Sequence, residues 1–295
     1  MKSVEFAPYL KIIKQKYPDI RQSQIVVRDY GWDFLVFIVN DLMVFRFPRD
    51  KRADKGLESQ VKFANRFYHD VNLSIPRPQI ENENGCRFMA YPFIQGEPLK
   101  PVWLRRCSVS KQSSMARQLG RFLTTLHAFS VNRASSLGIQ KRQAGFNSYD
   151  SVAYFRVHLH PHITEKEWRW VVGRLDEIQV LIRKSAFRPV VAHNDIAPTH
   201  ILFDPLKGRL TGIIDFGDLG IGDPAFDFFR LDVYPRAFLD QILSTYGGHI
   251  DGLFFEREQG YRDISLIHRL VHYMEKKDHK LVKTIADSFR RRIKT

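Results

Sequence analysis

Several side chains that can take up a proton or bind a metal border short apolar runs in one part of the sequence. His193, Asn194 and Asp195 follow the run VVA, His200 precedes ILF, and Asp215 follows GII. Short apolar runs bounded by polar loops are typical of buried strands. We therefore expect two carboxylates and one imidazole to lie at the ends of adjacent strands.

Phosphoryl transfer requires such a set of groups. Mg²⁺ neutralises the charge of the γ-phosphoryl group, and a base orients the acceptor hydroxyl and takes its proton. Mg²⁺ prefers oxygen ligands, which suits Asp215, whereas the imidazole of His200 is a softer ligand. A single His–Asp pair often has only a structural role, but the ordered set that ends in Ile-Asp-Phe-Gly is far more specific.

Residues 190–231 resemble the catalytic and metal loops of the aminoglycoside phosphotransferase family, relatives of protein and choline kinases. The segments HNDIAPTHILFD and RLTGIIDFGD are most similar to the branch that acts at the 2''-hydroxyl. His at position 200, where most of the family has Asn, recurs in that branch and in macrolide phosphotransferases. The resemblance implies that Asp195 is the catalytic base and that His200 and Asp215 bind Mg²⁺.

The same resemblance implies roles for three neighbouring residues. Asp218 matches an acidic position of the metal loop, where it serves a second metal or the substrate. Asp227 resembles the aspartate that braces the catalytic loop by binding its backbone, and His193 is a structural residue in the family. For Asp223, a carboxylate favoured by a helix dipole is an equally simple interpretation.

The expected nucleotide site follows from the first part of the chain. AYPFIQG resembles the family's hinge after the fifth strand, which implies that backbone groups of Pro92, Phe93 and Ile94 contact the nucleotide base. Arg46 stands where kinase-like enzymes carry a phosphate-binding Lys. Arg stays charged and can bind phosphate bidentately, although a surface strand residue is the alternative interpretation.

Two features of this region depart from the usual kinase pattern. The helix partner of the phosphate-binding cation, normally Glu, is expected at Glu58 or Gln60. Gly31 stands alone, without a GxGxxG run. The RxPR stretch and GWDFLVF resemble macrolide phosphotransferases, so the two parts of the chain resemble different branches.

The elements that position these residues fall into two groups. Residues 24–48 contain three apolar runs, separated by Gly31 and Asn40-Asp41, which predict an antiparallel meander. A helix over 55–69 and a strand at RFMAYPFI follow. Later, helical patterns cover 110–129, 164–184, 235–246, 264–276 and 279–293, with strands at 189–192, 199–203 and 209–215.

We therefore predict an α+β, two-lobed, protein-kinase-like fold. Residues 1–94 form a nucleotide-binding lobe with a small antiparallel sheet. Residues 95–295 form a larger, mostly helical lobe that carries the catalytic loop, the metal loop and the acceptor site. The cleft between two lobes is a usual place for a ligand.

Composition narrows the function classes. The chain has 295 residues and no apolar run of the roughly 18 to 20 residues that a membrane helix needs. The N-terminus lacks a signal peptide's apolar core, and Cys86 and Cys107 have no metal-like spacing, so a cytoplasmic location is expected. The net charge of +14 suggests nucleic acid, but the basic residues are scattered, and we expect neither nucleic-acid nor membrane partners.

The sequence predicts a phosphotransferase that uses ATP or GTP with Mg²⁺ and acts on an aminoglycoside, with antibiotic resistance as the outcome. Aminoglycosides are polycations, and the segment 204–263 holds eleven Asp and Glu against six Lys and Arg. The carboxylates that this segment could offer to an aminoglycoside are Asp218, Asp223, Asp251, Glu256 and Glu258.

Three alternatives remain open. A macrolide kinase would line its acceptor site with aromatic residues of the second lobe, which otherwise belong to the core: Tyr149, Tyr154, Phe155, Trp168 and Trp170. A kinase for a metabolite such as a sugar, choline or homoserine would share the fold. A catalytically silent nucleotide-binding protein is compatible with Arg46 and Gln60, although retention of Asp195, His200 and Asp215 argues against it.

Overall fold

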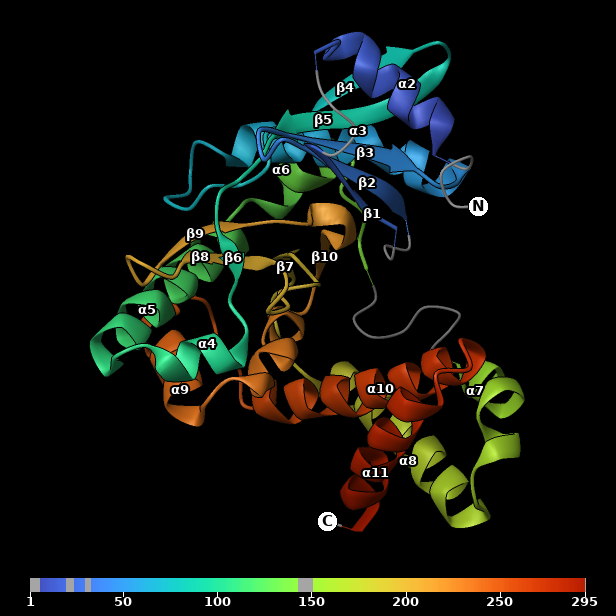
Figure 1. Cartoon of the computed structure of the whole chain (residues 1–295). Coiled ribbons are helices and arrows are strands. Elements are labelled where there is room, and N and C mark those ends of the chain that lie inside the picture. The colour runs from blue at the N-terminus through green and yellow to red at the C-terminus, as the bar shows by residue number, and fades with distance from the viewer. Residues whose placement is uncertain (1–5, 20–23, 30–32, 143–150, 295) are drawn as a thin grey trace.

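The computed structural model describes residues 6–19, 24–29, 33–142 and 151–294. Figure 1 shows a smaller sheet-containing lobe above a larger helical lobe, so the predicted α+β, two-lobed arrangement is confirmed. Gly31 and Tyr149 lie outside the described residues.

The first lobe is built on a five-stranded antiparallel sheet in the order β1-β2-β3-β5-β4. β2 and β3 form a hairpin whose turn residues, Asn40 and Asp41, have positive φ angles of 52° and 50°. Two such residues match the twist of a tight hairpin, and this confirms the predicted meander. The strands are β1 (Ile25–Arg28), β2 (Phe34–Val39), β3 (Met43–Pro48), β4 (Gln79–Glu83) and β5 (Cys86–Pro92).

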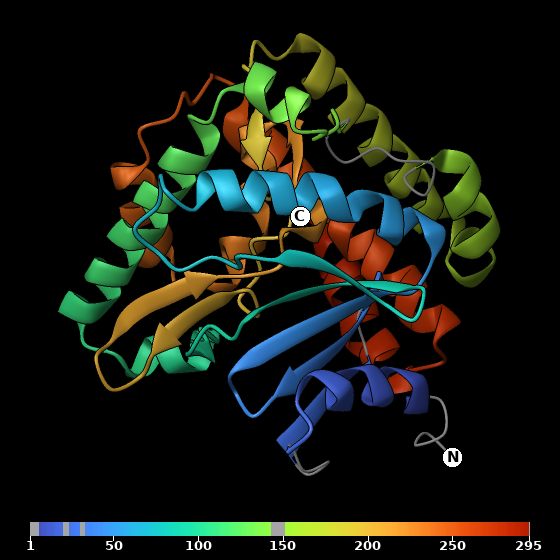
Figure 2. The ribbon, with the colours of Figure 1, turned by 90° about the horizontal axis from the view of Figure 1, so that it is seen from above.

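Two helices cover opposite faces of this sheet (Figure 2). On one face, α2 (Ala7–Lys16) packs Ile12 and Ile13 against aromatic side chains such as Phe45. On the other, α3 (Lys51–Phe67) contributes a small apolar cluster. Because side chains alternate along β3, Phe45 faces α2 whereas Arg46 faces the other side, toward the second lobe.

The second lobe is mostly helical, with short strands between the helices. Its α-helices are α4 (Pro101–Arg106), α5 (Val109–His127), α6 (Val131–Ser136), α7 (Val152–His158), α8 (Glu165–Lys184), α9 (Arg236–Thr245), α10 (Phe254–Glu275) and α11 (His279–Lys294). Its 3-10 turns are η3 (His160–His162), η4 (Phe216–Asp218), η5 (Pro224–Asp227) and η6 (Phe229–Val233).

One predicted helix boundary was wrong by a large margin. α10 begins at Phe254, whereas the sequence pattern predicted a helix only from residue 264. The first turns of α10 bury the charged residues Arg257 and Glu258, which hides the apolar period. Gly260 also weakened the pattern, but it lies where α8 approaches closely, and a Cβ there would be 2.0 Å from Cδ1 of Ile178.

The short strands converge beneath the first lobe. They form two small sheets, β6-β8-β9 and β10-β7, from β6 (Glu97–Pro98), β7 (Val190–Ala192), β8 (Ile201–Asp204), β9 (Arg209–Ile213) and β10 (Gly220–Gly222). Pairing of β8 with β9 places the start of β8 beside the end of β9, whereas β7 belongs to the other small sheet. No helix among the described residues is long and apolar enough to cross a membrane.

Candidate active site

A buried carboxylate anchors the loop that follows β7. Asp227 is 1% exposed and accepts hydrogen bonds from the backbone N–H groups of His193, at 2.8 Å, and Asn194, at 2.6 Å. Nε2 of His127 lies 3.0 Å from the same carboxylate, and Nδ1 of His127 lies 2.6 Å from the hydroxyl of Tyr246. The φ angle of 64° at Asn194 shows that the anchored loop makes a sharp, left-handed bend.

The side chain of His193 joins this loop to the segment before Asp215. Nε2 lies 3.1 Å from the carbonyl oxygen of Ile214, and Nδ1 lies 3.3 Å from the backbone N–H of Asp195. A carbonyl can only accept and an amide can only donate, so the ring is neutral with its proton on Nε2. Complete burial agrees with this, because it lowers the pKa of His193.

His200 lies between the two catalytic carboxylates expected from the sequence. Its Nδ1 donates to the backbone carbonyl of Asp195 at 2.8 Å and lies 3.2 Å from Oδ2 of the same residue. Because Nδ1 carries the proton, Nε2 keeps a free lone pair. This Nε2 lies 3.7 Å from Oδ2 of Asp215.

The third strand brings a cation to the same place. A guanidinium nitrogen of Arg46 lies 2.9 Å from Oδ1 of Asp215, and the guanidinium lies 4.4 Å from the ring centre of Phe34. Burial alone would raise the pKa of Asp215, but the Arg46 guanidinium outweighs burial and holds that pKa well below its usual range. Asp215 is thus a stable anion at the end of β9, in a left-handed conformation with a φ of 66°.

The partner of Arg46 differs from the expectation. The helix residue Glu58 pairs with Arg87 at 3.3 Å and does not contact Arg46, and no partner is found for Gln60 among the described residues. Asp215 takes the role of counter-ion, because Arg46 points past α3 toward the second lobe. Nε of Arg46 is buried and has no acceptor in the described part of the chain.

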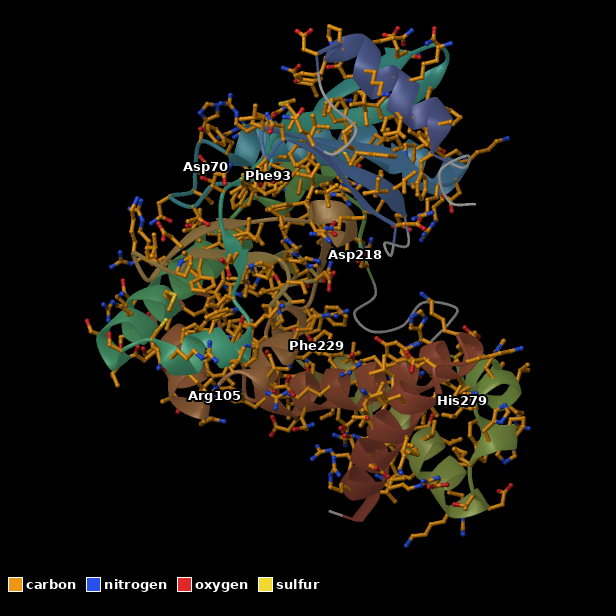
Figure 3. All side chains as sticks on the ribbon, viewed as in Figure 1. Asp70, Phe93, Arg105, Asp218, Phe229 and His279 are labelled. Carbon is orange, nitrogen blue, oxygen red and sulfur yellow. The ribbon has the colours of Figure 1, made fainter. Side chains whose placement is uncertain are left out.

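Two arginines complete the site, and the sequence analysis missed both. Nε of Arg230, on η6, lies 3.1 Å from Oδ1 of Asp195. The contact is an ion pair without hydrogen-bond geometry, so Oδ1 is a buried acceptor with no donor among the described residues. Arg142 lies 2.9 Å from Asp218, and both side chains are about half exposed. Figure 3 shows Asp218 beneath the first lobe, and Phe229, the neighbour of Arg230, lower in the same region.

The hinge leaves few backbone groups for a base. Pro92 has no N–H, and the N–H of Phe93 donates to the carbonyl of Leu42 at 2.7 Å. Pro92, Phe93 and Ile94 line a cavity of about 680 Å³, together with Asp204, Lys207, Arg209, Leu210 and Thr211. Arg46 and the catalytic-loop residues do not line it, and Phe93 lies apart from Asp218 in Figure 3.

The acidic segment 204–263 does not offer a cluster of free carboxylates. All of its Asp and Glu residues except Glu256 have an arginine, lysine or histidine nitrogen within 3.8 Å. Asp223 and Asp251 both bind the fully buried Arg257, and Glu258 binds Arg262 at 2.6 Å. Three of the five carboxylates expected to bind an aminoglycoside are therefore structural.

The aromatic residues expected to line a macrolide site are also mostly structural. Phe155 and Trp168 are buried in the core of the second lobe. Trp170 packs its ring against Phe289 of α11. Tyr154, which stacks on His158 of α7, and Trp170 are the partly accessible members of this set among the described residues.

Comparison with known proteins finds phosphotransferases. The family model described as "Phosphotransferase enzyme family" matches residues 25–259. An aminoglycoside 3'-phosphotransferase of Streptomyces fradiae is 36% identical over 85 residues, which cover 24% of this chain and 32% of that protein. A viomycin phosphotransferase of Streptomyces vinaceus is 23% identical over 76% of this chain and 79% of its own length.

Solved structures show the same fold over nearly the whole chain. The GDP and kanamycin complex of an aminoglycoside 2''-phosphotransferase superposes with a TM-score of 0.82 at 22% identity, covering 96% of this chain and 97% of that chain. A macrolide 2'-phosphotransferase type I gives a TM-score of 0.67 at 18% identity, covering 96% of each chain.

Proposed function

Because the chain belongs to the phosphotransferase enzyme family, whose model spans residues 25–259, we propose that it transfers the γ-phosphoryl group of ATP or GTP to a hydroxyl of a small molecule. One observation carries the proposal. Oδ1 of Asp195 is a buried carboxylate oxygen without a hydrogen-bond donor, and it lies beside the His200–Asp215 pair. A buried acceptor without a donor is costly unless the site uses it.

In the proposed reaction, Asp195 accepts a hydrogen bond from the acceptor hydroxyl. The hydroxyl oxygen forms a bond to the γ-phosphorus, the bond to the β–γ bridging oxygen breaks, and the hydroxyl proton passes to the Asp195 carboxylate. The loop is positioned for this by Asp227 and His193, which tie its backbone to buried groups. Positioning and charge stabilisation supply most of the rate enhancement in such reactions.

The residues present fit a magnesium ion. Asp215 is anionic and its Oδ2 lies 3.7 Å from Nε2 of His200, so these two side chains would hold the ion, with water and phosphate oxygens as its other ligands. Mg²⁺ bound there would neutralise negative charge on the nucleotide phosphates. Asp218 lies in the same loop and is the candidate for a second metal or substrate contact.

The nucleotide is proposed to lie between the lobes, with its phosphates near Arg46. The unpartnered Nε of Arg46 is a buried donor that a phosphate oxygen would satisfy. Ile94, with the carbonyls of Pro92 and Phe93, supplies the remaining hinge groups for the base. The protein would thus hold the donor with one basic side chain and backbone atoms.

The names of the relatives make aminoglycosides and macrolides the first acceptors to test. The test is consumption of ATP and of GTP with each acceptor, with and without Mg²⁺, in the wild type and in Asp215→Asn. Turnover that needs Mg²⁺ and is lost in the variant supports the proposal. Turnover that is unchanged in Asp215→Asn would show that the metal site lies elsewhere.

A further inference from the structure

Arg230 covers the oxygen that the proposed reaction needs. Its Nε lies 3.1 Å from Oδ1 of Asp195. This oxygen atom is buried, whereas the Arg230 side chain is 42% exposed. An acceptor hydroxyl must come within about 2.8 Å of this carboxylate. An acceptor hydroxyl at this distance shares the Asp195 carboxylate with the Arg230 guanidinium. A substituent on the carbon next to the one that bears the hydroxyl then lies within about 6 Å of that guanidinium.

The charges around the Asp195 carboxylate also disfavour a cationic acceptor. Asp218, the most exposed carboxylate of the site, pairs with Arg142 at 2.9 Å. The remaining carboxylates of segment 204–263 are paired as well, except Glu256. The whole chain carries a net charge of +14, so its long-range field opposes the approach of a polycation.

From these contacts we infer that Arg230 is a specificity-determining residue of the acceptor site. It disfavours acceptors with an ammonium group beside the reacting hydroxyl and admits neutral or anionic hydroxyl compounds. The inference rests on the proposed function and gives it a substrate class. Like charges brought together in a partly dehydrated site reduce affinity by about tenfold or more.

Binding of kanamycin directly tests whether Arg230 disfavours cationic acceptors. The dissociation constant is measured by calorimetry with Mg²⁺ and a non-hydrolysable ATP or GTP analogue, so the result does not depend on turnover. Arg230→Gln uncovers the Asp195 carboxylate and should bind kanamycin about tenfold more tightly than the wild type. Arg230→Lys keeps the positive charge and should stay near the wild type, which separates charge from folding.

Two further variants identify the source of the expected gain in kanamycin affinity. Arg236→Gln removes an exposed cation six residues further along the chain that pairs with Asp240, and it should bind kanamycin like the wild type. In Arg230→Gln with Asp195→Asn, the uncovered charge is absent and the gain should disappear. An anionic polyol such as gluconate should bind more weakly to Arg230→Gln than to the wild type.

The outcomes separate this inference from the proposed function. If Arg230→Gln binds kanamycin no more tightly than the wild type, or if the wild type phosphorylates kanamycin with a micromolar KM, Arg230 does not disfavour cationic acceptors. The proposed kinase activity is unaffected by either result. If nucleotide consumption with every acceptor is the same in the wild type and in Asp195→Asn, the proposed reaction is wrong, whatever the binding data show.

Discussion

Replacement of the buried brace, Asp227→Asn, should both destabilise the protein and disable the proposed catalytic loop. The carboxylate receives two backbone N–H groups, from His193 and Asn194, and faces Nε2 of His127. An asparagine keeps one acceptor oxygen and turns an NH₂ group toward another donor. Loss of a hydrogen bond to a charged group, with a buried donor left unpaired, costs about 2 to 4 kcal/mol.

That loss is a large part of the roughly 5 to 15 kcal/mol that stabilises an average domain. Urea unfolding should therefore show a lower free energy of unfolding, and turnover should fall by about a hundredfold, because a shift of about 1 Å in a catalytic group has that effect. Asp240→Asn is the matched control, since its ion pair with Arg236 is exposed and worth little. Equal stability and turnover in Asp227→Asn and the wild type would refute the brace.

Two other changes test separate parts of the structure. The folded-state pKa of Asp215 is depressed by Arg46, so this pair adds stability above the unfolded pKa of about 3.9 and loses it as the pH falls through the lower folded value. The difference in unfolding free energy between the wild type and Arg46→Met should therefore narrow below about pH 4, and a constant difference would argue against the ion pair. Gly260→Ala should destabilise by about 1 to 3 kcal/mol, because its Cβ would meet Ile178, whereas Gly173→Ala, with open space around it, should be neutral or stabilising.

The parts of the site that follow from local pattern were predictable. Asp195, His200 and Asp215 border short apolar runs, and the pairing of β8 with β9 brings His200 and Asp215 together, whereas β7, which precedes Asp195, pairs with β10. The sheet of the first lobe was also predictable from local pattern, because Asn and Asp, which tolerate positive φ angles, form the turn at Asn40 and Asp41.

The partners of these residues could not be read from the sequence. Arg230 reaches Asp195 across 35 positions, and Arg142 reaches Asp218 across 76, so no local period marks either contact. The net negative charge of the acidic segment suggested a binding surface, but the fold pairs its carboxylates with cations of the same segment, such as Arg257, and with distant ones, such as Arg142. Phe155 was expected to line an acceptor site, but it is fully buried in the core, and the sequence alone does not distinguish these two environments.

The most direct test of the account is the rate of acceptor phosphorylation by Asp195→Asn compared with the wild type, at saturating Mg²⁺ and nucleotide. The proposed base predicts a loss of at least about a hundredfold, with unchanged nucleotide affinity and an unchanged free energy of unfolding. A phosphorylation rate close to that of the wild type in a folded Asp195→Asn protein would contradict it.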